Sequence, residues 1–211
     1  MSEKRAFECT EIRAEESEDG KKSIKGYAAV FERDSVPMGF DGKIRERVAK
    51  GAFVDSLKDG DVRALWSHNP DFVLGRTKSG TLKLKEDQKG LAFELDLPDT
   101  QVARDAFTLI KRGDVTGMSF GFNIKDFEWE RGEGEKPHIR TLTKVDLHEI
   151  SPVAFPAYPD TEVVTRSLKK SLEEQEKIWE AEQEKPDAER QKKVSKALAA
   201  AKVQKARARV A

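Results

Sequence analysis

Three residue types that together support acyl transfer occur on separate segments of the chain. Ser119 lies in Met-Ser-Phe-Gly-Phe, His68 in Leu-Trp-Ser-His-Asn-Pro, and Glu149 in Asp-Leu-His-Glu-Ile-Ser. A serine hydroxyl attacks a carbonyl at neutral pH when a neutral imidazole within hydrogen-bond reach takes its proton. The imidazole then needs a partner that fixes its tautomer and stabilises the imidazolium. Any chain of this length contains such residues, so their types alone leave a small structural serine as the default interpretation of Ser119.

The neighbours of Ser119 indicate which way its side chain points. Successive side chains of a strand alternate between faces, so Met118 and Phe120 can be buried on one side while Ser119 and Gly121 face the other. The small residues Gly117 and Gly121 would let a substrate backbone approach closely. The segment lacks the strand–turn–helix setting of a Gly-x-Ser-x-Gly nucleophile, which disfavours an α/β-hydrolase and other serine esterases built on that turn.

Two residues compete for the third position of the set. Glu149 would orient His68 and offset its positive charge, and His148, directly before it, is the rival. Neighbours on a strand point to opposite faces, so both cannot act. Three histidines also raise the possibility of zinc, but their spacing matches no metal-ligand pattern and the single cysteine, Cys9, lies far upstream. We expect no metal and no cofactor.

Short strands at close spacing dominate the part of the chain that must position these residues. Two amphipathic segments predict helices over 52–60 and 100–114, and in the second Thr100 is the expected N-cap and Gly113 the end. His68 falls at the end of a strand, before a loop that Pro70 initiates. Apolar alternation and β-rich composition predict strands over 23–32, 62–68, 81–87, 90–98, 116–130 and 138–155. The pattern predicts an α+β, strand-rich fold, a closed or curled β-barrel surrounded by a few helices.

Composition divides the 211 residues into three parts. Residues 1–21 are polar, residues 22–165 hold nearly all the large apolar side chains, and residues 166–211 form a charged tail. The tail is acidic and helix-forming at first, then basic and alanine-rich, and it cannot bury a core alone. It is interpreted as a solvated helix or disordered extension, with a removable or assembly-directing tail as the functional alternative. The basic block at its end could bind nucleic acid, which is the less favoured interpretation.

Charge and cysteine content limit the class of protein. The formal net charge is zero, so the overall balance implies no acidic partner, and one cysteine permits no intrachain disulfide. The first 20 residues contain no apolar run typical of a signal peptide. No segment approaches the roughly 18–20 apolar residues that a membrane helix needs. We therefore expect a soluble intracellular protein without a membrane partner.

Four segments taken in order resemble one family. They are 51-GAF-53, 66-WSHNPDFVLGRT-77, 117-GMSFGF-122 and 147-LHEISPVAFPAYPDT-161. Their sequence and intervals are similar to those of the prohead maturation proteases of tailed bacteriophages, the group named after phage HK97. The resemblance covers about residues 22–161. It implies a serine endopeptidase related in fold to the herpesvirus assembly proteases, with a compact β-barrel ringed by helices.

The resemblance also implies roles for the three residues. Ser119 would be the nucleophile, His68 the general base and acid, and Glu149 the third member, which fits the phage pattern better than His148. The oxyanion donors are expected to be backbone N–H groups. Arg76, in Leu-Gly-Arg-Thr, would form a surface ion pair or organise the cleft, and the ion pair is favoured.

The function implied is cleavage of virion proteins inside the immature capsid, the prohead, in the host cytoplasm. The expected substrates are the scaffold or scaffold-like N-terminal part of the major capsid protein, and the protease itself. An extended substrate is expected to lie along a sheet edge. The portal protein is a further candidate partner, and a homodimer is conceivable by analogy with the herpesvirus enzymes. The alternative is a non-catalytic scaffold or capsid-assembly module descended from such a protease.

Overall fold

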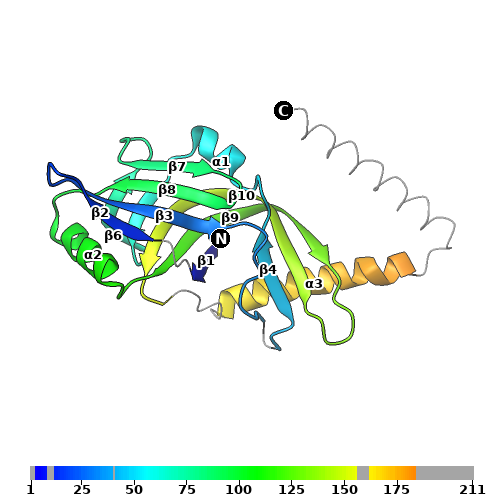
Figure 1. The fold of residues 1–211 in the computed structure, drawn as a ribbon. Helices are drawn as coiled ribbons and strands as arrows, with labels where there is room; N and C mark the ends of the chain where they lie inside the picture. The colour runs from blue at the N-terminus through cyan, green and yellow to red at the C-terminus, as the bar shows by residue number, and fades with distance from the viewer. Residues whose placement is uncertain (1–2, 9–11, 40, 156–161, 184–211) are drawn as a thin grey trace. The chain divides into compact units, whose positions relative to one another are not determined.

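The computed structural model describes residues 3–8, 12–39, 41–155 and 162–183. The chain divides into two compact units, Met1–Thr165 and Arg166–Ala211. All the described strands belong to the first unit (Figure 1). The site therefore has to be built from that unit alone.

The larger of two sheets has six strands and carries the candidate residues. Its order is β1-β9-β10-β5-β6, and β4 pairs with β10 beside this path. β9 runs antiparallel to both β1 and β10, whereas β4 and β5 run parallel to β10. The bounds are β1 Glu3–Glu8, β4 Ile44–Val48, β5 Arg63–Trp66, β6 Asn69–Arg76, β9 Gly117–Glu130 and β10 His138–Val153.

The smaller sheet has four strands in the order β2-β3-β8-β7, all antiparallel. They are β2 (Arg13–Glu16), β3 (Lys22–Val30), β7 (Leu82–Glu86) and β8 (Gly90–Asp96). The strand-rich α+β class is therefore confirmed. The described strands form two sheets, and no closed barrel is found among them.

Three helices accompany the sheets in the described part of the chain: α1 (Val54–Asp59), α2 (Gln101–Arg112) and α3 (Glu162–Gln183). α2 begins and ends as the sequence predicts. The Thr100 side chain accepts a hydrogen bond from the Ala103 N–H, and Gly113 closes the helix in the left-handed conformation with φ 84°. The buried stripe of α2, which includes Phe107 and Ile110, explains why this amphipathic segment folds onto the strands.

The core consists of apolar side chains from both sheets, from α2 and from the residues just before α1, and the partly buried Leu57 of α1 packs against it. Met118, Phe120 and Phe122 of β9 are fully buried members of this core. The Phe120 ring packs edge-on against Phe53, with centroids 5.5 Å apart, and lies 5.0 Å from the Phe122 ring. One face of β9 is thereby fixed against the core, which determines where the alternate residues of the strand point.

Two segments differ from the sequence prediction. A loop was expected directly after His68, but β6 begins at Asn69 and returns antiparallel to β5. Pro70 is compatible with this because β6 is an edge strand, paired with β5 only among the described strands. Residues 1–21, treated as a polar segment, contribute β1 to the larger sheet and β2 to the smaller one.

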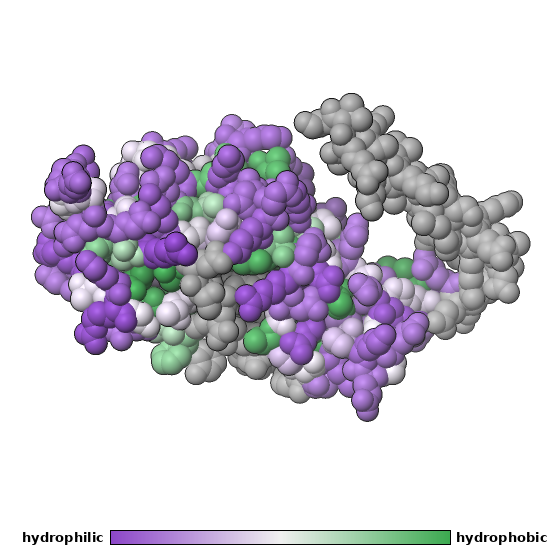
Figure 2. All heavy atoms as spheres, viewed as in Figure 1, coloured by the Kyte–Doolittle hydropathy of each residue, from purple (hydrophilic) through white to green (hydrophobic). Residues whose placement is uncertain are grey.

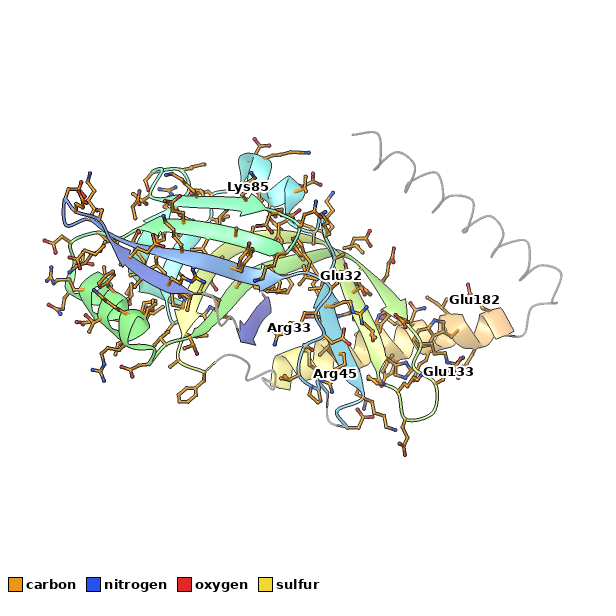
Figure 3. The ribbon with its side chains drawn as sticks, viewed as in Figure 1. Glu32, Arg33, Arg45, Lys85, Glu133 and Glu182 are labelled. Atoms are coloured by element: carbon orange, nitrogen blue, oxygen red, sulfur yellow. The ribbon has the colours of Figure 1, made fainter. Side chains whose placement is uncertain are left out.

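The surface is strongly polar. The face in Figure 2 is mainly hydrophilic, with small separate hydrophobic areas. Charged side chains project from the strands and loops, among them the labelled Arg45 of β4 and Lys85 of β7 (Figure 3). Within the described residues, no helix has the length and apolar character needed to cross a membrane.

Candidate active site

The pairing of β9 with β10 brings Ser119 and Glu149 to one face of the larger sheet. Ser119 lies opposite Ser151, and Gly121 lies opposite Glu149. Residues directly opposite in an antiparallel pair share a face, with Cβ atoms roughly 4.5–5.5 Å apart. Since Phe120 faces the core, Ser119 and its partners face away from it, as the alternation predicts. Ser119 is only 1% exposed, so this face is covered rather than open.

Gly121 makes room for the Glu149 carboxylate. A Cβ placed on Gly121 would lie 2.5 Å from Glu149 Oε1, 3.1 Å from its Cγ and 3.2 Å from its Cδ. The carboxylate therefore lies across the backbone of β9, two residues from Ser119 in the strand. The sequence prediction assigned the space at Gly121 to a substrate backbone, and this was wrong because Glu149 fills it.

His68 occupies a tight turn that β10 holds in place. β5 runs parallel to β10, with Arg63 beside Glu149, so the end of β5 reaches Ser151 and Pro152. Ser67 and His68 form the two-residue connection to β6, and both have positive φ, 52° and 62°. Positive φ at both central positions is the pattern of a type I′ hairpin turn.

The imidazole of His68 is joined directly to Glu149. Its Nδ1 lies 2.6 Å from Glu149 Oε1, with the two side chains 19% and 11% exposed. A carboxylate only accepts hydrogen bonds, so a neutral His68 ring donates from Nδ1–H and carries its lone pair on Nε2. This is the tautomer that a general base needs.

Sequence reasoning missed one member of this cluster, Ser151. Its hydroxyl donates to Glu149 Oε2 at 2.6 Å and accepts from the His68 backbone N–H at 3.1 Å. Since Ser119 lies opposite Ser151 across the strands, Ser119 and the His68 turn both border the same side chain. A signal was available: residues two apart on a strand share a face, which places Ser151 beside Glu149.

The two remaining candidates lie outside the cluster. His148 is half-buried, and within the described residues it makes no hydrogen bond to the His68 ring, whose Nδ1 partner is Glu149. Arg76 forms the expected ion pair: its Nε donates to Asp61 Oδ1 at 2.6 Å. The guanidinium lowers the pKa of Asp61 to about 2. Arg76 is therefore engaged with Asp61 and not with the three candidate residues.

No group of three or more metal-binding side chains occurs within the described residues. A broad hollow of about 980 Å³ lies between β2, β3, β8 and the start of α2, and is lined by residues such as Lys25, Glu94 and Arg104. It contains none of the site residues, and its walls carry paired charges such as Lys25 with Glu15 and Glu94. The candidate catalytic residues therefore lie outside this hollow, around β5, β9 and β10.

Comparison with known proteins agrees with this class of site. The family model described as caudovirus prohead serine protease matches residues 8–177, and the chain belongs to that family. Membership gives the chain a serine-protease role in capsid maturation within the phage prohead. The chain is similar to the prohead protease of Escherichia phage T5, with 25% identity over 161 residues, covering 74% of this chain and 67% of the relative. No solved structure is significantly similar.

Proposed function

We propose that the chain is an endopeptidase whose catalytic triad is Ser119, His68 and Glu149. The observation that carries this proposal is the 2.6 Å contact between His68 Nδ1 and Glu149 Oε1, one strand away from a serine on the same face. A carboxylate bonded to Nδ1 leaves Nε2 as the basic atom, which is the arrangement of a serine peptidase. Family membership supports the same class of reaction.

The reaction is acyl transfer to water in two steps. Ser119 Oγ attacks the peptide carbonyl while His68 Nε2 takes its proton, and the imidazolium then protonates the leaving amine. A water molecule attacks the resulting ester while His68 takes its proton; the ester C–O bond then breaks, and the imidazolium returns the proton to Ser119 Oγ. Glu149 remains ionised throughout and stabilises the imidazolium. Backbone N–H groups are the donors we expect at the oxyanion.

The burial of Ser119 has a consequence for this mechanism. With 1% of its surface exposed, the residue meets a peptide carbonyl only when the residues that cover it move. The edge strand β6, which starts next to His68, is available for an extended substrate, because strand addition at an edge uses free backbone groups. We therefore expect the residues that cover Ser119 to move when a substrate binds.

The proposed substrates are the scaffold or the scaffold-like N-terminal segment of the major capsid protein, and the protease itself. The family description and the phage T5 relative, named a prohead protease, support a role inside the prohead. In this proposal, residues 22–165 are the catalytic part and the portal protein is a further partner. The proposed relation in fold to the herpesvirus assembly proteases is also the reason to propose a homodimer. The assignment of residues 166–211 as a tail lost by self-cleavage rests on the loss of core-forming residues there; residues 184–211 lie outside the described part.

Co-expression with the major capsid protein of the same phage tests the proposal. Wild type and His148→Ala are expected to shorten the capsid protein, whereas Ser119→Ala and His68→Ala leave it at full length. His148→Ala is the matched control, since it removes a histidine one residue from Glu149 that does not bond the His68 ring. Identical capsid-protein bands with wild type and His68→Ala would favour the non-catalytic assembly module instead.

The intact mass of the purified protease tests self-cleavage separately. Under conditions in which wild type shortens the capsid protein, it should lose mass from its C-terminal end, and Ser119→Ala should not. Masses that differ only by the one oxygen atom of the substitution would show that the tail is retained.

A further inference from the structure

A fully buried serine beside the proposed triad uses both hydrogen-bonding capacities of its hydroxyl. Ser151 Oγ donates its proton to Glu149 Oε2 at 2.6 Å and accepts from the His68 N–H at 3.1 Å. The first bond leaves the other carboxylate oxygen, Oε1, to face His68 Nδ1. One side chain therefore contacts the carboxylate and the backbone of the base at the same time.

The bond to Glu149 fixes the direction of the carboxylate. A glutamate side chain has three rotatable bonds, and the arrangement observed here places Oε1 2.6 Å from His68 Nδ1. Ser151 holds the Glu149 carboxylate through the hydrogen bond to Oε2, and Gly121, which has no side chain, leaves space for the same carboxylate. Hydrogen bonds to charged groups are stronger than those between neutral groups, so this bond is well suited to fix a rotamer.

The bond to the His68 backbone acts on a strained turn. Positive φ favours glycine or asparagine, but Ser67 and His68 adopt it at 52° and 62°. Such a conformation persists when its surroundings enforce it. Two hydrogen bonds to β10 enforce the turn conformation here. The Ser67 N–H donates to the Pro152 carbonyl at 3.2 Å, and the His68 N–H donates to Ser151 Oγ.

We propose that Ser151 is a positioning residue for peptide hydrolysis, which holds the Glu149 carboxylate and the His68 turn in the geometry that the base requires. The proposal rests on the proposed function, because it assigns Ser151 to the same site. Ser151 acts through Glu149 and His68 and does not touch the substrate. Its proton is directed at Glu149 and not at the imidazole.

The chain offers a matched control in Ser56. This serine is also buried, its Oγ donates to the Val145 carbonyl at 2.6 Å, and it accepts from the Leu147 N–H at 2.9 Å. It thus bonds β10 with the same donor and acceptor pattern, but it contacts no residue of the triad. Ser56→Ala and Ser151→Ala both remove a buried hydroxyl with two partners, and only the second should affect catalysis.

The first experiment measures kcat and KM of Ser151→Ala, Ser151→Thr and Ser56→Ala on a peptide that spans the capsid cleavage site. Ser151→Ala should lower kcat about 10- to 100-fold with KM little changed, because a bond to a charged group of the site is lost. Ser151→Thr, which keeps the hydroxyl, should recover most of the loss, and Ser56→Ala should retain the wild-type kcat. A wild-type kcat in Ser151→Ala, or an equal loss in Ser56→Ala, would overturn the proposal.

The second experiment does not depend on activity. The proton on His68 Nδ1, bonded to a carboxylate, is expected to give a downfield proton resonance that disappears in His68→Ala. In Ser151→Ala this resonance should shift or broaden, also in a Ser119→Ala background, whereas Ser56→Ala should leave it in place. If wild type fails to cleave but the resonance responds to Ser151, the proposed function fails, and what stands is that Ser151 holds the Glu149 carboxylate and the His68 turn. An unchanged resonance in Ser151→Ala would overturn the positioning role, as would a covalent serine-probe adduct on Ser151.

Discussion

Replacing Gly121 by alanine should disable the proposed triad without touching any of its members. The new Cβ would lie 2.5 Å from Glu149 Oε1, whereas an ordinary contact begins near 3.4 Å. The carboxylate must therefore move by about 1 Å, which would lengthen the 2.6 Å bond to His68 Nδ1 to about 3.5 Å. At that separation the interaction no longer counts as a hydrogen bond.

The size of the effect follows from the bond that is lost. Hydrogen bonds to charged groups are worth about 1.5–3 kcal/mol, and each 1.36 kcal/mol changes a rate tenfold. Gly121→Ala should therefore lower kcat about 10- to 150-fold. Stability should fall by no more than the value of that same bond, about 1.5–3 kcal/mol, because the displaced atom is the end of a flexible side chain and the extended backbone of β9 accepts alanine.

Peptide-cleavage kinetics and thermal unfolding of four proteins test this prediction: wild type, Gly121→Ala, Glu149→Ala and the double variant. If alanine acts through Glu149, the double variant should be no slower than Glu149→Ala alone, so the two effects are not additive. A wild-type kcat in Gly121→Ala would refute the reasoning, and so would fully additive losses in the double variant.

Three further predictions concern stability. Burial raises the pKa of Glu86, so the folded state binds its proton more tightly and stability is lost as pH rises above the ordinary value of 4.5. In urea unfolding, Glu86→Gln and wild type should be equally stable near pH 4, and the variant should be more stable at pH 7. The opposite trend would contradict this. The bond from Arg76 lowers the pKa of Asp61 from 3.8 to about 2, so Asp61→Asn should be less stable than wild type at pH 7. This difference in stability should vanish as pH falls from about 4 to 2. A difference in stability that grows in acid would be inconsistent with the ion pair. Arg140 and Glu46 form a buried ion pair, and their side chains are 2% and 1% exposed. Arg140→Met should therefore lower the free energy of unfolding by about 3–5 kcal/mol in chemical denaturation. A loss under about 1 kcal/mol would show that the pair is dispensable.

The sequence predicts local structure best where one physical signal dominates. α2 follows from its apolar stripe, the Thr100 cap and the left-handed Gly113, all of which are local. The direction of Ser119 follows from alternation, because Met118 and Phe120 are large enough to fix one face of β9 in the core. β6 was missed because Pro70 signals a loop and four consecutive residues of this edge strand are exposed, which leaves no alternating pattern.

The site shows where sequence reasoning ends. Residue types and family resemblance predict that Ser119, His68 and Glu149 act together, but their placement near one another depends on pairing across β5, β9 and β10. The roles of Gly121 and Ser151 depend on the register that places them against Glu149, and a sequence without register cannot show which small residue faces a carboxylate. Alternation could have placed Ser151 on the face of Glu149, yet only the structure shows that it bonds the His68 backbone.

Mapping the adduct of a fluorophosphonate-type serine probe tests the central claim most directly. The probe is added to the protease co-expressed with its capsid protein, under conditions in which wild type shortens that protein, and the labelled residue is located by peptide mass spectrometry. The account predicts a single adduct on Ser119 in wild type, none in Ser119→Ala or His68→Ala, and weaker labelling in Glu149→Gln. Labelling of a different serine, or equal labelling of Ser119 with and without His68, would contradict it.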